Sequence, residues 1–364
     1  MRRLLILAAV SAALPASAAH AQPVRDGKKL LSCPDPTIVD ARVAGYRYHM
    51  ACTSDRAPDV FPLRESNDLV HWKQIGSVFT KRNQPWWALH APRDGHYWAP
   101  ALYRMGNRWV LYFAAEHNPR RLSLHYPGGG TVAGSNMLIA VATSRSLHGP
   151  WMSRVLHFRG QFNAVTREHE NYGGVIDPSV VRDGTTGQLY LFWAEQHSSI
   201  WVSRLSPDGL TISPTIHQAL WTQPGWECRT PRRTCTVEGP EEYYRDGWFY
   251  LFYSGASTWT GSYAIGVGAS QDPLVSQFQR LDSRPALRSG NGYVGPGGSS
   301  APVLGPDGRT YIFYHALTRP DPDHDSAARY LFFSPIRWEG LGDYDPVIGS
   351  GQVDLRTAAA AQEP

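Results

Sequence analysis

One phrase recurs along the chain and constrains its fold more than any other feature. It runs from a turn or acidic residue through a short strand and a glycine-containing hairpin turn to an aromatic strand. Five copies start 63, 79, 61 and 61 residues apart. They read DPTIVDARVAGYRYHMA, WAPALYRMGNRWVLYFAA, DPSVVRDGTTGQLYLFWAE, EGPEEYYRDGWFYLFYSG and SSAPVLGPDGRTYIFYHA. Each interval has room for four strands, and a pair of β-sandwiches would not repeat one hairpin phrase five times. The sequence therefore predicts an all-β fold, a five-bladed β-propeller.

The chain ends differ in composition from the repeats. Two arginines, an apolar run over residues 4–14 and a small-x-small site at 19–21 are typical of a secretory signal peptide, so we expect cleavage after residue 21. The propeller domain is predicted over 22–356, followed by an Ala-rich tail at 357–364. No other segment reaches the roughly 20 apolar residues of a spanning helix. We expect a secreted or periplasmic protein that does not insert into a membrane.

Four cysteines form an even set, which fits disulfides in an exported protein. Pairing of Cys33 with Cys52 and of Cys228 with Cys235 closes a short loop each time, so we favour it over the other two connectivities. Neither pair has the close spacing usual for a zinc site. Two disulfides are the prediction.

Charge and aromatic content point to a different partner from nucleic acid. The net charge is only +4 and the basic residues are scattered, which argues against a nucleic-acid partner. The chain has 13 Trp, 18 Tyr and 12 Phe. Most of these should fill strand cores. The pairs Trp86-Trp87 and Tyr97-Trp98 invite a second interpretation, as flat platforms for sugar rings. We expect a carbohydrate partner and a monomer.

Three carboxylates begin repeats in three different blades: Asp35, Asp177 and Glu238. The first strand of every blade lines the central channel, so the three should converge at one end of it. Carboxylates that meet in an apolar surrounding raise the pKa of at least one of them. Glycoside hydrolysis uses such a set, with one carboxyl group kept protonated and another kept ionised.

The ordered motifs PDPTIV, HYWAPALY, IAVATSRSLHGPW, VIDPSVV, VEGPEEYY and AARYLFFSPIRWE resemble glycoside hydrolase family 43 over nearly the whole mature chain. The resemblance implies a five-bladed propeller that hydrolyses arabinose- or xylose-containing polysaccharides with inversion. It makes Asp35 the general base, Glu238 the general acid, and Asp177 the residue that orients the acid and tunes its pKa. It also places Trp98 in the wall of the sugar subsite and Arg329 beside the sugar and the carboxylates.

Strand alternation bears on the other two acids of VEGPEEYY. If Glu238 faces the channel, Glu241 lies on the opposite face, whereas Glu242 faces with Glu238 further along. We therefore interpret Glu241 as structural or rim-facing and Glu242 as a candidate buried partner. The segment 81–96, with Trp86 and Trp87, is predicted to form part of the substrate cleft.

Two positions depart from the family pattern. Ala101 stands where many members carry an aspartate, and Gly298 stands where they often carry a histidine that helps hold a hydrated calcium ion in the channel. The glycine makes that calcium ion doubtful, and His315 or His90 are the candidates to reach the same space. Otherwise no cofactor is expected.

The leading functional hypothesis is a secreted inverting glycosidase acting on arabinan or arabinoxylan, an α-L-arabinofuranosidase or arabinanase. A β-xylosidase, or another pentose or galactose specificity, would use the same carboxylates. The related fructan- and sucrose-cleaving propellers carry Arg-Asp-Pro and Glu-Cys, where this chain has Ile176-Asp177-Pro178 and Glu238-Gly239. From a different class, a non-catalytic carbohydrate-binding propeller stays open, although it would not need all three carboxylates.

Overall fold

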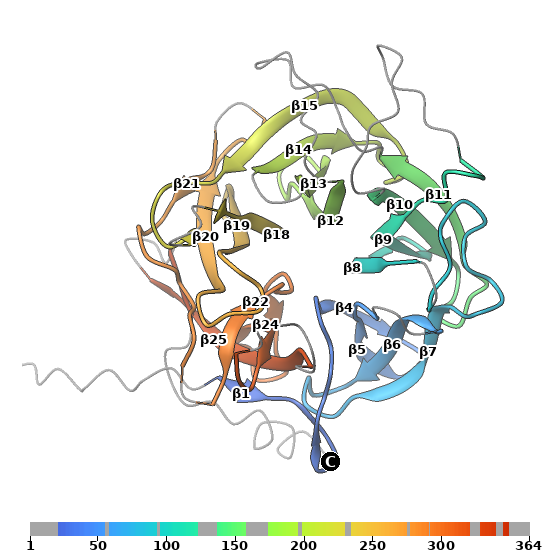
Figure 1. The fold of residues 1–364 in the computed structure, drawn as a ribbon, viewed down its shortest axis with the longest axis horizontal. Helices are drawn as coiled ribbons and strands as arrows, with labels where there is room; N and C mark the ends of the chain where they lie inside the picture. Colours follow the sequence, from blue (N-terminus) through green and yellow to red (C-terminus); the bar gives the residue numbers. More distant parts are fainter. Residues whose placement is uncertain are drawn as a thin grey trace, which may run out of the picture.

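Five β-sheets stand around a central channel in a closed ring (Figure 1). This computed structural model describes residues 21–54, 58–92, 95–122, 137–157, 174–195, 199–229, 234–274, 277–290, 292–320, 328–339 and 345–348. The predicted signal peptide, apart from Ala21, and the Ala-rich tail lie outside those ranges. Within them, no helix has the length and apolar character needed to cross a membrane. The predicted five-bladed β-propeller is confirmed.

Each blade is an antiparallel meander whose first strand lies nearest the channel and whose last lies at the rim (Figure 1). The first blade contains β4 (Thr37–Val43), β5 (Tyr46–Ala51), β6 (Val60–Ser66) and β7 (Lys73–Phe79). The second contains β8 (Tyr97–Met105), β9 (Arg108–Glu116), β10 (Met137–Ser144) and β11 (Met152–His157). The third contains β12 (Val175–Arg182), β13 (Leu189–Glu195), β14 (Ser199–Leu205) and β15 (Ile212–Trp221). The fourth contains β18 (Val237–Arg245), β19 (Trp248–Gly255), β20 (Ala264–Ser270) and β21 (Gln279–Arg280).

The fifth blade joins the two ends of the ring. It contains β22 (Val294–Gly297), β23 (Val303–Leu304), β24 (Thr310–Leu317), β25 (Tyr330–Glu339) and β26 (Asp345–Ile348). The first strand of the chain, β1 (Gln22–Pro23), pairs with β25, so the N-terminal segment completes the last blade. Backbone pairing between opposite ends of the chain therefore closes the propeller and leaves no open gap between the first and last blades.

Apolar side chains fill the spaces between neighbouring blades. A separate buried cluster occupies each of the five blade interfaces; examples are Trp109 between the first two blades, Trp193 between the second and third, and Tyr314 between the last two. The middle strands are buried on both faces, which explains their near-continuous aromatic and aliphatic sequences. Most of the aromatic residues thus build the walls that hold the inner strands in place.

Both predicted disulfides are confirmed. Cys33–Cys52 links the entry to β4 with the end of β5. Cys228–Cys235 crosses the hairpin of β16 (Cys228–Arg229) and β17 (Thr234–Cys235), which leads directly into β18. The remaining short hairpin pairs β2 (Arg25–Asp26) with β3 (Lys29–Leu30). Each disulfide therefore lies just before or beside an inner strand.

An identical irregularity occurs near the start of all five inner strands. The residue before a proline takes a positive φ in each case, between 46° and 60°. In four blades the pairing with the second strand shifts there, and in the first blade the irregularity lies between the Pro34–Thr53 hydrogen bond and β4. The five residues are Asp35, Ala99, Asp177, Gly239 and Gly295. Positive φ is uncommon for residues other than glycine, and such conformations cluster at functional sites.

Candidate active site

A cavity of about 260 Å³ opens at the channel end where the five bulges meet. Asp35, Asp177 and Glu238 all line it, as the repeat predicts, together with Trp98 and Arg329. The other lining residues are Ala99, Pro100, Ile176, Pro178, Gly239, Pro240, Glu241, Thr258, Trp259, Tyr263, Gly298 and Ser299. Side chains or backbone from all five blades therefore border one small, partly apolar space.

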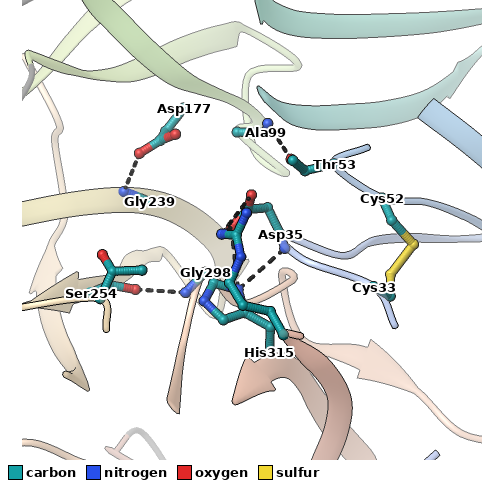
Figure 2. A network of polar contacts seen from close by, with 12 residues as sticks. Cys33, Asp35, Cys52, Thr53, Ala99, Asp177, Gly239, Ser254, Gly298 and His315 are labelled. Atoms are coloured by element: carbon teal, nitrogen blue, oxygen red, sulfur yellow. Dashed lines mark hydrogen bonds and ion pairs between the residues drawn. A yellow bond between two sulfur atoms is a disulfide. The ribbon is translucent and has the colours of Figure 1, made fainter. Parts of the chain in front are cut away.

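Asp35 lies among cationic and hydrogen-bonding groups. The Arg329 Nη1 atom is 3.2 Å from Oδ1 and 3.3 Å from Oδ2 of its carboxylate, and His315 Nδ1 is 3.2 Å from Oδ1. The backbone N–H of Asp35 also points at the His315 ring, and Thr53 contacts the carboxylate while accepting a hydrogen bond from the Ala99 N–H (Figure 2). Burial alone would raise the pKa of Asp35, but Arg329 and His315 outweigh it and hold that pKa well below its ordinary value. Asp35 is ionised.

Asp177 and Glu238 form the opposite wall. The Asp177 Oδ2 atom accepts a 2.9 Å hydrogen bond from the backbone N–H of Gly239, the residue after Glu238 (Figure 2). Burial, followed by the negative charges of Glu238 and Asp35, raises the pKa of Asp177 well above its usual range. Oε1 of Glu238 accepts hydrogen bonds from Tyr263 at 2.7 Å and from Thr258 at 3.0 Å. Two hydroxyl donors thus hold the Glu238 carboxyl group on this wall.

The bulges correct the predicted alignment of the three acids. Asp35 and Asp177 both stand at the bulge before proline, but Glu238 lies one residue earlier, because Gly239 is the bulged residue of β18. By register, Trp98 in β8 and Ile176 in β12 are the counterparts of Glu238. Glu238 therefore reaches the cavity from a neighbouring position rather than from the same one.

The same bulge makes the predicted orientation of Glu241 and Glu242 wrong. An extra residue between the Glu238 and Glu241 pairs shifts the alternation of side chains, so Glu241 lines the cavity instead of facing the rim. Glu242 is 4% exposed and does not line the cavity. Its Oε2 atom accepts a 2.7 Å hydrogen bond from Ser179 of β12. The prediction of a buried Glu242 is confirmed, but its partner lies in the next blade.

Three further lining residues were missed by the sequence interpretation: Thr258, Trp259 and Tyr263. They lie in the loop between β19 and β20, in the sequence STWTGSY. Thr258 and Tyr263 donate hydrogen bonds to Glu238. The Trp259 ring lies 5.6 Å below the guanidinium carbon of Arg329. An aromatic residue in a polar loop, immediately after the second strand of an acid-bearing blade, was the available signal.

The predicted aromatic platforms divide into two groups. Trp98 lines the cavity, and its ring stacks on His96 with centroids 5.2 Å apart. Trp87 is 2% exposed and stacks on Phe113 in the core between the first two blades, so its prediction as a sugar platform is wrong. Trp86 is 61% exposed and does not line the cavity. The adjacent pair thus separates into one core and one surface residue.

The fit of a calcium ion to the channel near Asp35 depends on the side chains there, since calcium takes several oxygen ligands at once. A Cβ atom on Gly298 would lie 2.5 Å from both Asp35 Oδ1 and His315 Cε1, so a histidine cannot occupy this position beside His315. Within the described ranges, no three His, Cys, Asp or Glu side chains are grouped to hold a metal. His315 instead contacts Asp35, and His90 Nε2 lies 3.2 Å from the Pro85 carbonyl oxygen. These two histidines therefore do not form a calcium site in the described part of the chain.

Comparison with known proteins decides the family. The model of glycosyl hydrolases family 43 matches residues 29–342. The chain belongs to this family. Family 43 enzymes are glycoside hydrolases, and the fold and the family expected from the motifs are confirmed.

Similar family 43 proteins carry several names. The chain is 26% identical to a putative β-xylosidase of Xylanibacter ruminicola over 86% of its length and 49% of that protein. It is 25% identical to extracellular endo-α-(1→5)-L-arabinanase 1 of Bacillus subtilis (strain 168), covering 84% of each. The crystal structure of a thermostable family-43 glycoside hydrolase superposes with a TM-score of 0.69 at 22% identity, covering 88% of this chain and 95% of that one. This family 43 chain thus spans about half of the first relative and most of the second.

Proposed function

We propose that this family 43 protein is an exported, inverting glycoside hydrolase that acts on arabinose-containing plant polysaccharides, as an α-L-arabinofuranosidase or arabinanase. One observation carries the proposal: a single cavity holds an ionised Asp35 beside Arg329 and, on its other wall, two carboxyl groups whose repulsion and burial favour retention of a proton. Inverting glycosidases require this division between a base and an acid.

Asp35 takes the role of general base. Its carboxylate accepts a proton from a water molecule as that water attacks the anomeric carbon, on the face opposite the leaving oxygen. Arg329 keeps the carboxylate ionised, and the backbone N–H of Asp35 fixes its position against His315. In this mechanism the acid and base carboxyl groups stand about 6.5–9.5 Å apart, which leaves room for the water.

Glu238 takes the role of general acid. Two hydroxyl groups donate to its Oε1 atom and hold the carboxyl group in the cavity, where it protonates the leaving oxygen. Asp177 acts on Glu238 through the N–H of the next residue, and its own charge, when present, disfavours loss of the acid proton. Asp177 is therefore a positioning residue in this proposal.

The size and lining of the cavity support a small sugar as the substrate unit. A volume of about 260 Å³ lies at the small end of ligand pockets, which favours one terminal sugar ring held against Trp98 over a long segment of chain. The relatives include a protein named extracellular endo-α-(1→5)-L-arabinanase 1 and another named non-reducing end α-L-arabinofuranosidase. Export is supported by the two disulfides and by the extracellular relatives.

A β-xylosidase, or another pentose or galactose glycosidase, is the second candidate, favoured by the relative named putative β-xylosidase. The same three carboxyl groups would perform that reaction, so only the other side chains that line the pocket distinguish the two specificities. A non-catalytic carbohydrate-binding propeller remains the third candidate. The ionised Asp35 opposite a proton-holding pair argues for turnover.

Product analysis on linear arabinan, branched arabinan and xylan tests the proposal. We expect single arabinose units from the arabinans, with the inverted anomer appearing first in a proton NMR time course. Glu238→Gln should remain folded and nearly lose this release, because its amide cannot protonate the leaving oxygen. Xylose as the main product would move the assignment to the β-xylosidase. Binding of arabinan without any product would favour the non-catalytic propeller, and wild-type release by the variant would reject Glu238 as the acid.

A further inference from the structure

The cavity contains a fourth carboxyl group that the proposed hydrolysis does not use. Glu241 lies three residues after Glu238 on β18, and the bulge at Gly239 turns it toward the cavity that it lines. We propose that Glu241 is a specificity-determining residue whose carboxyl group hydrogen-bonds a hydroxyl group of the sugar held there. This inference rests on the glycoside hydrolysis proposed above.

The groups that act on Glu241 come from four blades, and none of them is a cation. The backbone N–H of Ala301, in the fifth blade, donates to its carboxyl group. Glu242 beside it on β18 and Asp177 of β12 are its acidic neighbours, and Glu241 in turn acts on the Tyr103 hydroxyl group of β8. Asp35, by contrast, takes the Arg329 guanidinium.

This environment favours the protonated form. Burial is the main effect that raises the pKa of Glu241 well above its ordinary value, and the charges of Glu242 and Asp177 add to it. A protonated carboxyl group carries one O–H donor and a carbonyl acceptor. A sugar hydroxyl likewise donates once and accepts, so the two groups are complementary in a way that an ionised carboxylate, which only accepts, is not.

The expected consequence is discrimination between sugars by one hydroxyl position. A buried polar group arranged for a substrate hydroxyl is left without a partner when the substrate lacks it, and such sites reject the analogue strongly. Glu241 would therefore reject a sugar without that hydroxyl, whereas Trp98 would tolerate it as a flat apolar wall. A structural role for Glu241 predicts no dependence on any particular hydroxyl.

The test combines variants of Glu241 with deoxy substrates. The full chain and its Glu241→Leu and Glu241→Gln variants are assayed on 4-nitrophenyl α-L-arabinofuranoside and its 2-, 3- and 5-deoxy analogues, or on the corresponding xylosides if wild type prefers them. Glu242→Gln is the matched control, because it removes the neighbouring carboxyl group that does not line the cavity. Melting temperatures establish that each variant folds.

We expect Glu241→Leu to lower kcat/KM on the parent substrate by about 10- to 100-fold. On one deoxy analogue, which wild type already hydrolyses poorly, the same change should cost less than about threefold. Glu241→Gln keeps a donor and an acceptor, so it should keep the wild-type preference for the hydroxyl group. If Glu241→Leu does not fold, Glu241→Gln carries the test.

Two results would overturn the inference. One is equal loss by Glu241→Leu on the parent and on every deoxy analogue; the other is a Glu241→Gln variant without the wild-type hydroxyl preference. Either can occur while wild type hydrolyses pentosides normally, which leaves the proposed function standing. A wild-type protein that hydrolyses no pentoside contradicts the proposed function and this inference together.

Discussion

The two walls of the cavity hold the same kind of side chain in opposite electrostatic surroundings. On one wall Arg329 and His315 contact Asp35 and keep its pKa low. On the other wall Asp177 has a carboxyl group as its main charged neighbour, so burial and repulsion raise its pKa. All the acids come from inner strands or the turns that enter them. The position in the repeat therefore brings the carboxyl groups together, whereas the contacts of each wall decide which of them holds a proton.

Removing the Asp35 carboxylate, on the wall that contains Arg329, should have the largest effect on turnover. Asp35→Asn retains the shape but cannot accept the proton of the attacking water, so we expect kcat/KM to fall by about 10⁴-fold. Steady-state kinetics on an aryl pentoside measure the loss. Wild-type thermal stability is the control for folding, and a fall of less than tenfold would show that Asp35 is not the base.

Removing the Arg329 guanidinium group should make the pKa of Asp35 more like that of the acids on the other wall. In Arg329→Met only His315 and Thr53 oppose the effect of burial on Asp35, so the pKa of Asp35 rises. Because the base works only when ionised, the acidic limb of the kcat/KM profile should move to higher pH, with a loss of about 10² at neutral pH. Arg284→Met, at an exposed pair with Asp282, is the matched control and should leave the limb in place. An unmoved limb in Arg329→Met would separate Arg329 from the base.

A smaller change on the other wall removes one hydrogen bond to the acid. Tyr263→Phe deletes the hydroxyl that lies 2.7 Å from Glu238 Oε1, while the Thr258 contact stays. We expect kcat/KM to fall by about tenfold, the effect of one hydrogen bond to a charged or reacting group. Kinetics on the aryl pentoside check it. Tyr293→Phe, at a tyrosine outside the cavity, should change the rate little; equal losses in both would indicate a general packing effect.

The smallest effect on turnover is expected at Glu242, which follows Glu241 on β18 but does not line the cavity. Burial raises the pKa of Glu242 from 4.5 to about 8. Because this pKa is higher in the folded chain than in the unfolded chain, the folded chain binds more protons between pH 4.5 and pH 8. The contribution of Glu242 to the free energy of unfolding therefore falls over that range, by about 1.4 kcal/mol per pH unit. Glu242→Gln removes that loss and should stabilise the protein at pH 8 relative to wild type, with unchanged kcat.

Denaturant unfolding of wild type and Glu242→Gln at pH 5 and pH 8 measures the difference. Glu241→Gln serves as the companion variant, because its carboxyl group is raised in pKa as well but lines the cavity. A stability of Glu242→Gln that falls with pH as steeply as that of wild type would contradict a protonated, buried Glu242.

The sequence predicted the propeller and the cavity because both depend on repetition. Five copies of one phrase fix the number of blades, and strands that start alike bring Asp35, Asp177 and Glu238 to one end of the channel. The bulge before each proline was not predicted, since strict two-residue alternation has no place for an extra residue. It accounts for the errors at Glu238, Glu241 and Glu242.

A second kind of error concerns aromatic residues, which can lie either in the core or on the surface. Trp86 and Trp87 look alike in sequence, but only contacts across the blade interface place Trp87 against Phe113 and leave Trp86 on the surface. Trp259 and Tyr263 were missed because they lie in the loop after β19, which is not part of the repeated phrase. Local pattern thus predicts elements, whereas packing between blades decides which aromatic residues reach the cavity.

One pH profile tests most directly whether the two walls hold a base and an acid. The substrate is a 2,4-dinitrophenyl pentoside, whose leaving group needs no proton, and the protein is Glu238→Gln. With the acid removed and Asp35 intact, kcat/KM should keep the acidic limb of the wild-type profile and lose the alkaline limb. A Glu238→Gln variant that keeps the alkaline limb and loses the acidic one would contradict these roles, because it would make Glu238 the base.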